Sequence, residues 1–281
     1  DEIQRGGALP PRRNRSRRGH REPVAGGAGG RAPMVRGTCA WRRAALGLPA
    51  VVFGWTNCSR TSPLSCLASS LPAPSVIVVG IAGGTGAGKT TLARGLCERL
   101  GHDTAALLSH DSYYHDLSHL PQAERVATNM DHPSALDTEL LVSQLGELRA
   151  GRAVSIPGYD FASFVRRPNE ATIVRPRQVL VVEGILVLAH SALRGLMDLK
   201  VFVDADPGLR LRRRRTRDVR ERGRTPAAVD AQFAATVRPM HSKFVEPSRQ
   251  HADMVVSGEE GSEATLEAVL ARLSELLPRR P

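Results

Sequence analysis

Five apolar runs predict the strands of one buried sheet. In each run the apolar residues follow one another without polar alternation, which is typical of a parallel sheet covered on both faces. The runs span residues 76–82, 105–109, 179–184, 199–203 and 252–256. Stretches with helical spacing separate them and span residues 90–100, 137–150, about 207–222, 226–245 and 262–277. This alternation predicts an α/β fold with a doubly wound, mostly parallel sheet, and a site at the carboxyl ends of its strands.

One segment departs from this alternation. Residues 153–174 contain Pro157, Gly158 and Pro168 between short extended pieces. Because proline in a sheet is confined to edges, strand starts and bulges, this pattern predicts strands outside the main sheet. We therefore expect a small β-hairpin subdomain inserted in the α/β frame.

The positive charge of the chain is concentrated near its beginning. The whole chain has a formal net charge of +11, and residues 1–74, with twelve arginines against three acidic residues, account for +9 of it. This leader is rich in Gly, Pro, Arg and Ser and has no sustained apolar period, so we expect it to be disordered. Residues 75–281 are long enough for one well-cored α/β domain.

The leader admits three interpretations. An Arg-rich arm can bind nucleic acid through phosphates, but this one has no aromatic interleaving and no folded reader, so we do not expect a nucleic-acid partner. The absence of acidic residues over 23–97 resembles an organelle transit peptide. The interpretation we favour is a start site assigned too early, with Met34 or a later codon as the true beginning.

The same segment bears on membrane and redox chemistry. The apolar run at residues 44–55 follows Arg42 and Arg43 but is too short to span a bilayer. Residues 83–90 match G-x-x-x-x-G-K-[ST], which predicts nucleotide binding. An ATP-dependent enzyme would lack its substrate outside the cell, so we expect a cytoplasmic protein, with an organelle as the alternative. The four cysteines, at positions 39, 58, 66 and 97, have no C-x-x-C spacing and favour neither a disulfide framework nor a zinc site.

The loop between the first strand and the first helix carries the most specific chemical signal. Residues 83–90 match G-x-x-x-x-G-K-[ST] in the strand–loop–helix context that a phosphate-binding loop requires. Its glycines let backbone N–H groups point at phosphate oxygens, and the helix N-terminus adds positive charge. We expect a nucleoside triphosphate to bind Gly83, Gly84, Thr85, Gly86, Ala87, Gly88, Lys89, Thr90 and Thr91.

Three charged groups and a hydroxyl around this loop predict the chemistry. Lys89 would reach the β- and γ-phosphates, and the Thr90 hydroxyl would hold Mg²⁺. Glu183 ends an apolar strand, where an unpaired carboxylate is costly, so Mg²⁺ or its bound water is a natural partner and a structural salt bridge is the alternative. Asp111 follows the strand at 105–109 and could accept a proton from an attacking hydroxyl. The alternative for Asp111 is a helix N-cap or a turn.

Nine arginines crowd residues 210–224. Arg210, Arg214 and Arg217 share one helix face, and Arg222 and Arg224 flank a flexible glycine. Planar guanidinium groups grip phosphate oxygens with two hydrogen bonds, so residues 207–224 are predicted to form a lid over the transferring phosphate. A solvated helix face is the alternative for several of these arginines.

Six further pieces, in order and at their spacing, resemble the uridine kinase (uridine–cytidine kinase) family. The pieces are residues 109–114 (SHDSYY), 129–137 (NMDHPSALD), 156–161 (IPGYDF), 181–186 (VVEGIL), 217–224 (RDVRERGR) and 236–241 (TVRPMH). The resemblance covers about residues 76–257. It implies the phosphate-loop nucleoside-kinase fold and transfer of phosphate from ATP, with Mg²⁺, to the 5′-hydroxyl of uridine or cytidine. It also implies a homotetramer.

The resemblance assigns roles to individual residues. The catalytic set would be Asp111, Lys89, Arg217 and Arg222, the two arginines contacting the ATP phosphates. The remaining substrate-binding residues would be Asp131, Tyr159, Phe164, Arg214, Arg224 and Gln232. Asp131 would accept hydrogen bonds from the ribose 2′- and 3′-hydroxyls, a role that is compatible with a turn before Pro133.

One position departs from the family pattern. Three residues after Phe161 the family has a histidine that meets the polar edge of the pyrimidine, and this chain has Phe164. A phenyl ring can stack but offers neither donor nor acceptor, so the sequence leaves the preference between uridine and cytidine open. Two other functions also stay open: a kinase of another small alcohol on the same fold, and a nucleotide-dependent nucleic-acid-binding protein.

Overall fold

A computed structural model describes residues 76–259 and 262–277 of the chain. Within them five strands form one sheet in the order β2-β5-β1-β6-β7, and every neighbouring pair is parallel. The strands are β1 (Ile77–Gly83), β2 (Ala105–Ser109), β5 (Val179–Glu183), β6 (Leu199–Asp204) and β7 (Met254–Ser257). The predicted parallel sheet is therefore confirmed. The predicted leader, residues 1–74, lies outside the described residues.

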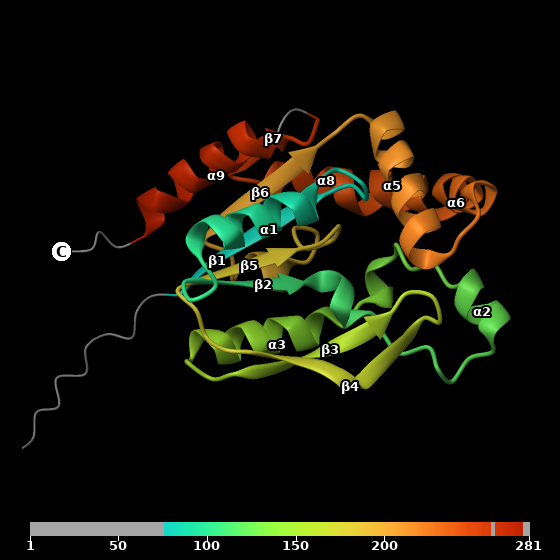
Figure 1. Cartoon of the computed structure of the whole chain (residues 1–281), viewed down its shortest axis with the longest axis horizontal. Coiled ribbons are helices and arrows are strands. Elements are labelled where there is room, and N and C mark those ends of the chain that lie inside the picture. Colours follow the sequence, from blue (N-terminus) through green and yellow to red (C-terminus); the bar gives the residue numbers. More distant parts are fainter. Residues whose placement is uncertain (1–75, 260–261, 278–281) are drawn as a thin grey trace, which may run out of the picture. The chain divides into compact units, whose positions relative to one another are not determined.

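The unbroken apolar runs are explained by burial on both faces of the sheet. Along β1, Val78 and Ala82 belong to one buried cluster, whereas Ile77, Val79 and Ile81 belong to the other. Helices α1 (Lys89–Leu100) and α9 (Ser262–Leu276) cover the second face through Leu92, Leu96, Val269 and Leu273 (Figure 1). Every residue of β1 and of β5 is thus buried, whichever face of the sheet it points to.

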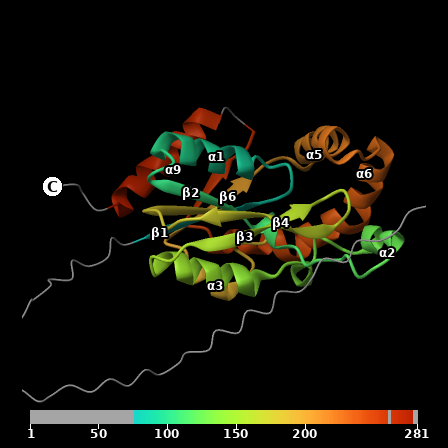
Figure 2. The same ribbon diagram turned by 60° about the horizontal axis from the view of Figure 1, so that its bottom comes forward.

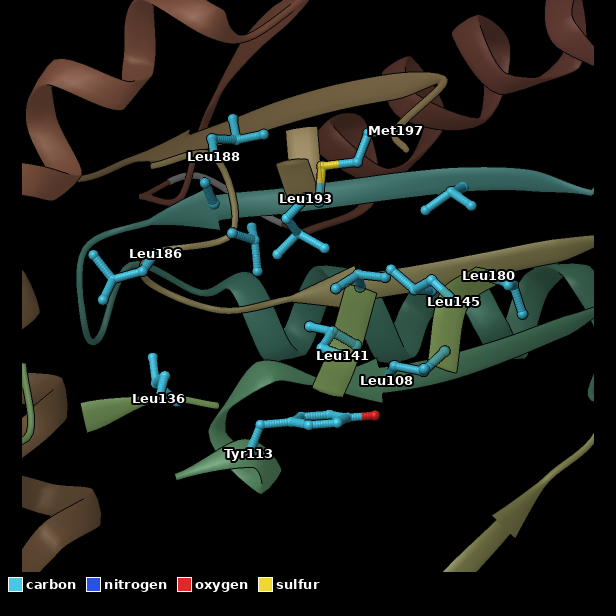
Figure 3. Packing of buried hydrophobic residues seen from close by; sticks show 14 of the residues in the cluster. Leu108, Tyr113, Leu136, Leu141, Leu145, Leu180, Leu186, Leu188, Leu193 and Met197 are labelled. Carbon is cyan, nitrogen blue, oxygen red and sulfur yellow. The ribbon is translucent and has the colours of Figure 1, made fainter. Parts of the chain in front are cut away.

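Helix α3 (Thr138–Arg149) covers the opposite face. Its Leu141 and Leu145 approach Leu108 of β2 and Leu180 of β5, with the Tyr113 ring beside them (Figure 3). The helix begins where the sequence predicts, because the Asp137 side chain accepts a hydrogen bond from the Leu140 N–H at 3.2 Å.

The inserted hairpin is present. Strands β3 (Val154–Asp160) and β4 (Val165–Val174) pair antiparallel as a separate two-stranded sheet. Their register shifts between Ile156 and Gly158, at Pro157, which cannot donate a ladder hydrogen bond. The hairpin lies beside α3 in both views (Figures 1 and 2).

The arginine-rich helix α5 (Pro207–Arg222) has the predicted bounds. The Asp206 side chain accepts from the Leu209 N–H at 2.9 Å at its start, and Gly223 takes a left-handed φ of 63° at its end. A second short helix, α6 (Pro226–Gln232), follows, capped by Thr225. Both lie at the same end of the domain as α2 (Figure 1).

The prediction of one regular helix over residues 226–245 is wrong, because the helical path is irregular and ends later. After α6 the helical path continues to His251, with π-helical turns at Phe233–Val237 and His241–Val245. The intervening short pieces are α7 (Arg238–Met240), α8 (Glu246–Ser248) and a 3₁₀ turn at Arg249–His251. Pro239 and Pro247 lack the N–H of a regular helix, and wider turns accommodate them.

Two short helices were not predicted from the sequence. They are α2 (Gln122–Ala127), which has no buried residue, and α4 (Ser191–Arg194). Neither is long enough to show a helical period, and α2 has no apolar face to produce one. Among the described helices, none combines the length and apolar character needed to cross a bilayer.

Candidate functional site

The carboxyl ends of β1, β2 and β5 meet at one cavity. Helix α5 and the β3–β4 hairpin contribute further walls. The lining residues are Thr85, Lys89, Thr90, Asp111, Tyr114, Met130, Asp131, Phe161, Phe164, Glu183, Ile185, Arg214, Arg217, Arg222, Arg224 and Gln232. The structure therefore brings together side chains that are up to 147 positions apart (85 to 232) in the sequence.

The phosphate loop has a backbone that only small residues permit. Gly86 and Gly88 have φ of 76° and 105°, in the region that favours glycine. A Cβ on Gly86 would come within 2.4 Å of the Arg210 carbonyl oxygen. No side chain caps the start of α1 at Gly88, so the first N–H groups of the helix can bind an anion.

Lys89 is held at the phosphate end of the cavity. Its side chain is buried, and Nζ donates to the Gly84 carbonyl oxygen at 3.0 Å. Burial lowers the pKa of Lys89, while the charges of Glu183 and Asp111 favour its protonated form. The ammonium group therefore lies in the field of two carboxylates, where phosphate oxygens would be its natural partners.

Glu183 and Thr90 form a set of hard oxygen donors. Glu183 is 5% exposed; its Oε1 accepts from Ser109 Oγ at 2.7 Å and its Oε2 from Thr90 Oγ1 at 3.3 Å. Burial, and after it the Asp111 charge, raises the pKa of Glu183. Within the described residues Glu183 has hydroxyl partners and no salt bridge. A divalent cation would relieve the crowding of the two carboxylates, so these residues fit Mg²⁺.

Asp111 lies between the two ends of the cavity. It belongs to a 3₁₀ turn at His110–Tyr113, directly after β2, and Ser109 rather than Asp111 occupies the N-cap position. At the phosphate end of the cavity, its charge favours the protonated form of Lys89. At the opposite end, burial has the larger effect on Asp131, and the Asp111 charge adds to it in raising the pKa of Asp131. The N-cap alternative for Asp111 is therefore wrong.

Four of the nine arginines of the predicted lid reach the cavity, and Arg210, which shares a helix face with two of them, does not. Arg214, Arg217, Arg222 and Arg224 are among the lining residues. Arg210 lies beneath the phosphate loop, where its Nε donates to the Ala205 carbonyl oxygen at 3.1 Å and its Nη2 meets His241 Nε2 at 3.2 Å. Burial lowers the pKa of Arg214 and of Arg222, so both are dehydrated cations.

Asp131 and Gln232 provide oxygen acceptors at the far end of the cavity. Asp131 is buried, and its Oδ2 accepts from Thr236 Oγ1 at 3.3 Å. Burial raises the pKa of Asp131, an effect that the Arg214 charge opposes. Asn129 Oδ1 accepts the Asp131 N–H at 3.1 Å, so the turn is closed by Asn129 and the Asp131 carboxylate is left facing the cavity.

The turn of the hairpin brings two aromatic rings to the cavity. Phe164 is buried and has φ of 59°, which is strained for a bulky residue. The turn is held by a hydrogen bond from Phe164 N to the Asp160 carbonyl oxygen at 2.8 Å. The Arg222 guanidinium lies 4.3 Å from the centroid of the Phe161 ring, and that of Arg224 lies 5.8 Å from the Phe164 ring. Arginines of α5 and of the loop after it thus meet the hairpin across the cavity.

Seven predicted residues lie outside this lining. Five belong to the phosphate loop itself, namely Gly83, Gly84, Gly86, Ala87 and Gly88, and the other two are Tyr159 and Thr91. Tyr159 packs against Tyr114 and Phe161, with ring centroids 5.4 and 5.1 Å apart. Thr91 is exposed on α1 and lines a separate groove with Leu266 of α9. The structure thus places Tyr159 behind the aromatic wall of the cavity and Thr91 away from it.

Sequence reasoning missed one charged residue and two residues with hydroxyl groups. Asp218 is fully buried beneath the arginines, although four-residue spacing from both Arg214 and Arg222 was a signal for it. Ser109 and Thr236, which bond to the two buried carboxylates, had no signal beyond their place in the quoted motifs.

A parallel sheet, a phosphate loop at the end of β1 and facing carboxylates and arginines define a phosphate-loop phosphotransferase. The chain belongs to the Phosphoribulokinase / Uridine kinase family, which matches residues 78–262. The resemblance inferred from the sequence motifs is therefore confirmed.

Several known proteins are similar to this chain. A protein of Chloroflexus aurantiacus named Uridine kinase is 46% identical over 205 residues, which are 73% of this chain and 98% of the relative. A Clostridium perfringens protein of the same name is 42% identical over 201 residues, covering 72% and 96%. A crystal structure of a kinase assigned to fructose transport in Silicibacter sp. TM1040 has a TM-score of 0.53 at 20% identity, covering 66% of this chain and 92% of that one. This last similarity concerns the fold alone.

Proposed function

We propose that this phosphotransferase transfers the γ-phosphoryl group of ATP to the 5′-hydroxyl of uridine or cytidine, giving UMP or CMP. The observation that carries the proposal is one cavity in which the phosphate loop faces Asp131 and the aromatic hairpin turn. The relatives named Uridine kinase, which align over nearly their whole length, support the same acceptor class.

At the phosphate end, the chain contributes positive charge and backbone donors. The loop at residues 83–90 would bind the phosphates through N–H groups, with Lys89 on the β- and γ-phosphates. Thr90 and Glu183 would hold Mg²⁺, which when bound neutralises phosphate charge. Arg217 and Arg222 would bind the oxygens of the transferring group from the opposite wall.

At the acceptor end, side chains orient the nucleoside. Asp131 would accept hydrogen bonds from the ribose 2′- and 3′-hydroxyls, while Asp111 takes the proton of the 5′-hydroxyl as it attacks. Arg214, Arg224 and Gln232 would contact the nucleoside. The Gln232 Oε1 atom already accepts from Arg214 Nη2 at 2.9 Å and Arg224 Nη1 at 2.7 Å.

Closure of the arginine-rich lid is part of the proposal. The cavity has a volume of about 60 Å³, whereas ligand sites usually measure about 300–1,000 Å³. A nucleoside therefore enters only if residues 207–224 or the hairpin move outward. Closing again would exclude water from the transferring phosphate.

The proposed assembly and location are extensions of this function. We propose that residues 1–74 are a leader without a catalytic role and that residues 75–281 are the kinase domain. The family resemblance supports a homotetramer, and the need for ATP supports a cytoplasmic location.

A coupled assay of the full chain against a panel of nucleosides and small alcohols tests the activity. We expect ATP- and Mg²⁺-dependent phosphorylation of uridine or cytidine. Turnover of a small alcohol with none on any nucleoside would replace the proposed substrate by the alternative acceptor, for which the comparisons give no support.

Truncation tests the nucleic-acid-binding alternative. Removal of residues 1–74 should leave nucleoside phosphorylation unchanged, because every proposed site residue lies after them. Loss of turnover on truncation, together with salt-sensitive nucleic-acid binding by the full chain, would favour the alternative.

A further inference from the structure

Asp218 is the centre of the arginine cluster in the last turn of α5. Its carboxylate is fully buried. Arg217 Nε donates to Oδ1 at 2.9 Å, and Arg217 Nη2 lies 2.8 Å from the same oxygen. Arg224 Nη1 donates to Oδ2 at 3.2 Å. The Nε atoms of Arg214 and Arg222 lie 3.5 and 3.7 Å from Oδ2 and Oδ1. One carboxylate thus meets the four arginines that line the cavity.

The arrangement has an excess of positive charge. Four guanidinium groups around a single carboxylate leave a net charge of +3, and each arginine repels the other three. Burial alone would raise the pKa of Asp218, but the charges of Arg217, Arg222 and Arg214 outweigh it and lower the pKa. The carboxylate therefore stays ionised and offsets part of the repulsion between the arginines.

Asp218 itself does not line the cavity. Its partners do: Arg217 and Arg222 are the proposed phosphate ligands, and Arg214 and Arg224 the proposed nucleoside ligands. A bidentate guanidinium acts only within a narrow range of orientation, and Asp218 determines that orientation for Arg217 through one hydrogen bond and a second close ion-pair contact to the same oxygen.

We propose that Asp218 is a positioning residue for phosphoryl transfer, which holds the four arginines of the lid in their working orientation without touching substrate. This inference rests on the proposed kinase function of the same cavity. It assigns a role to a carboxylate that neither binds metal nor accepts the proton. It also explains a buried acid on a helix face otherwise occupied by arginines.

The fold offers a variant that isolates this role. The turn after α5 is held by the Asp218 backbone carbonyl, which accepts from Gly223 N and, at 3.2 Å, from Arg224 N. Asp218→Asn therefore keeps the turn and the side-chain shape. It removes the negative charge and places an amide donor against guanidinium donors.

Asp230→Asn is a matched control. The Asp230 carboxylate pairs with Arg215 of α5 at 2.5 Å, and both side chains are more than 40% exposed and outside the cavity. This variant removes an aspartate–arginine pair between α5 and α6, but on the outer surface. Exposed pairs of this kind contribute little to stability.

The kinetic test separates positioning from a structural role. For Asp218→Asn we expect kcat to fall by about tenfold to a hundredfold, the usual scale for misplaced catalytic groups. The Kd for ATP should stay within about threefold, because loss of a negative charge does not weaken binding of an anion. Asp230→Asn should match the parent in both. Normal kcat in folded Asp218→Asn, or kcat and ATP affinity falling together with the folded fraction, would overturn the proposal.

Arginine reactivity provides a second measurement that needs no turnover. Phenylglyoxal adducts, located by mass spectrometry, should form several-fold faster at Arg217 and Arg224 in Asp218→Asn, and faster only at Arg215 in Asp230→Asn. Unchanged rates at Arg217 and Arg224 would overturn the proposal. Uridine turnover by the parent decides the proposed function separately: if it is absent, arginine reactivity alone decides the role of Asp218.

Discussion

The two ends of the cavity are built in different ways. The phosphate end is one contiguous loop, residues 83–90, fixed between a buried strand and the helix that covers it. The acceptor end is assembled from Asp131 in a loop, Phe164 in the hairpin turn, Arg224 after α5 and Gln232 at the end of α6. The first relies mainly on backbone groups and the second on side chains.

This difference determines at which end of the cavity the amino-acid sequence can change. A side chain cannot be added at Gly86 without meeting the Arg210 backbone, so the phosphate end has few alternatives. At the acceptor end a single side chain can change while the backbone stays, and we expect such a change at Phe164, where the family pattern predicts a histidine. Phosphate binding is therefore expected to be common to the family, and base preference particular to this chain.

Lys89→Ala tests the phosphate end most directly. We expect turnover to fall by on the order of a thousandfold, the upper range for loss of one preorganised charged donor. The domain should remain folded, because burial lowers the pKa of Lys89 and its charge is a cost to the folded state. The measurements are kcat and the thermal midpoint, with exposed Lys243→Ala as the control. Retained turnover in folded Lys89→Ala would refute this assignment.

Asp111→Asn tests the boundary between the two ends. The variant keeps the shape of the side chain but loses the proton acceptor, so kcat should fall by about a hundredfold or more. ATP affinity should change little, because Asp111 is not part of the phosphate loop. The exposed Asp103→Asn is the control. Near-normal kcat with a raised KM for nucleoside would make Asp111 a binding residue of the acceptor end.

Phe164→His tests how the acceptor end discriminates between uridine and cytidine. Phe164 gives the polar edge of a pyrimidine no hydrogen-bond partner, and one recovered bond is worth about 1–2 kcal/mol. We therefore expect kcat/KM for uridine to rise about 5- to 30-fold relative to cytidine. Histidine also tolerates the φ of 59° better than phenylalanine does, so the fold should not suffer.

The measurement is kcat/KM for both nucleosides at fixed ATP, in the parent and the variant. Phe244→His, outside the cavity lining, controls for an added imidazole. Equal uridine-to-cytidine ratios in parent and variant would show that Phe164 does not meet the base edge.

The pH dependence of nucleoside binding should distinguish the ends by a smaller effect. Burial raises the pKa of Asp131, so its carboxylate loses its charge at a higher pH than an exposed aspartate does. A carboxylic acid accepts the ribose hydroxyls less well, so KM for nucleoside should rise a few-fold as the pH falls through this pKa.

The raised pKa of Asp131 also makes the stability of the folded state depend on pH. A folded-state pKa above the unfolded value makes the ionised Asp131 destabilising at neutral pH, and this cost in stability becomes smaller as the pH falls.

The pH dependence of nucleoside binding is tested by measuring KM for uridine between pH 7 and 5 in the parent and in Asp131→Asn. The variant should show a flat profile. An equally steep profile in both proteins would assign the titration to another group.

The sequence by itself determined the sheet, the phosphate loop and the family. Continuous apolar runs indicate strands that are buried on both faces of the sheet. The phosphate loop can be recognised from eight consecutive residues, because it binds phosphate mainly through its own backbone groups. The bounds of α5 agree with the predicted 207–222, and the structure adds Asp206 and Gly223 as its caps. The place of the hairpin was predicted from Pro157, Gly158 and Pro168. Spacing along the chain contains this information because neighbours interact.

Only the tertiary structure decided which of the many polar side chains share the cavity. Among the arginines of α5, spacing could not separate Arg210, which lies beneath the phosphate loop, from Arg214, which lines the site. The contact of the Arg222 guanidinium with the Phe161 ring and the hydrogen bond from Thr236 to Asp131 likewise depend on segments that meet only after folding. Contacts between distant segments leave no period in the sequence, because their geometry comes from how the sheet, hairpin and lid pack together.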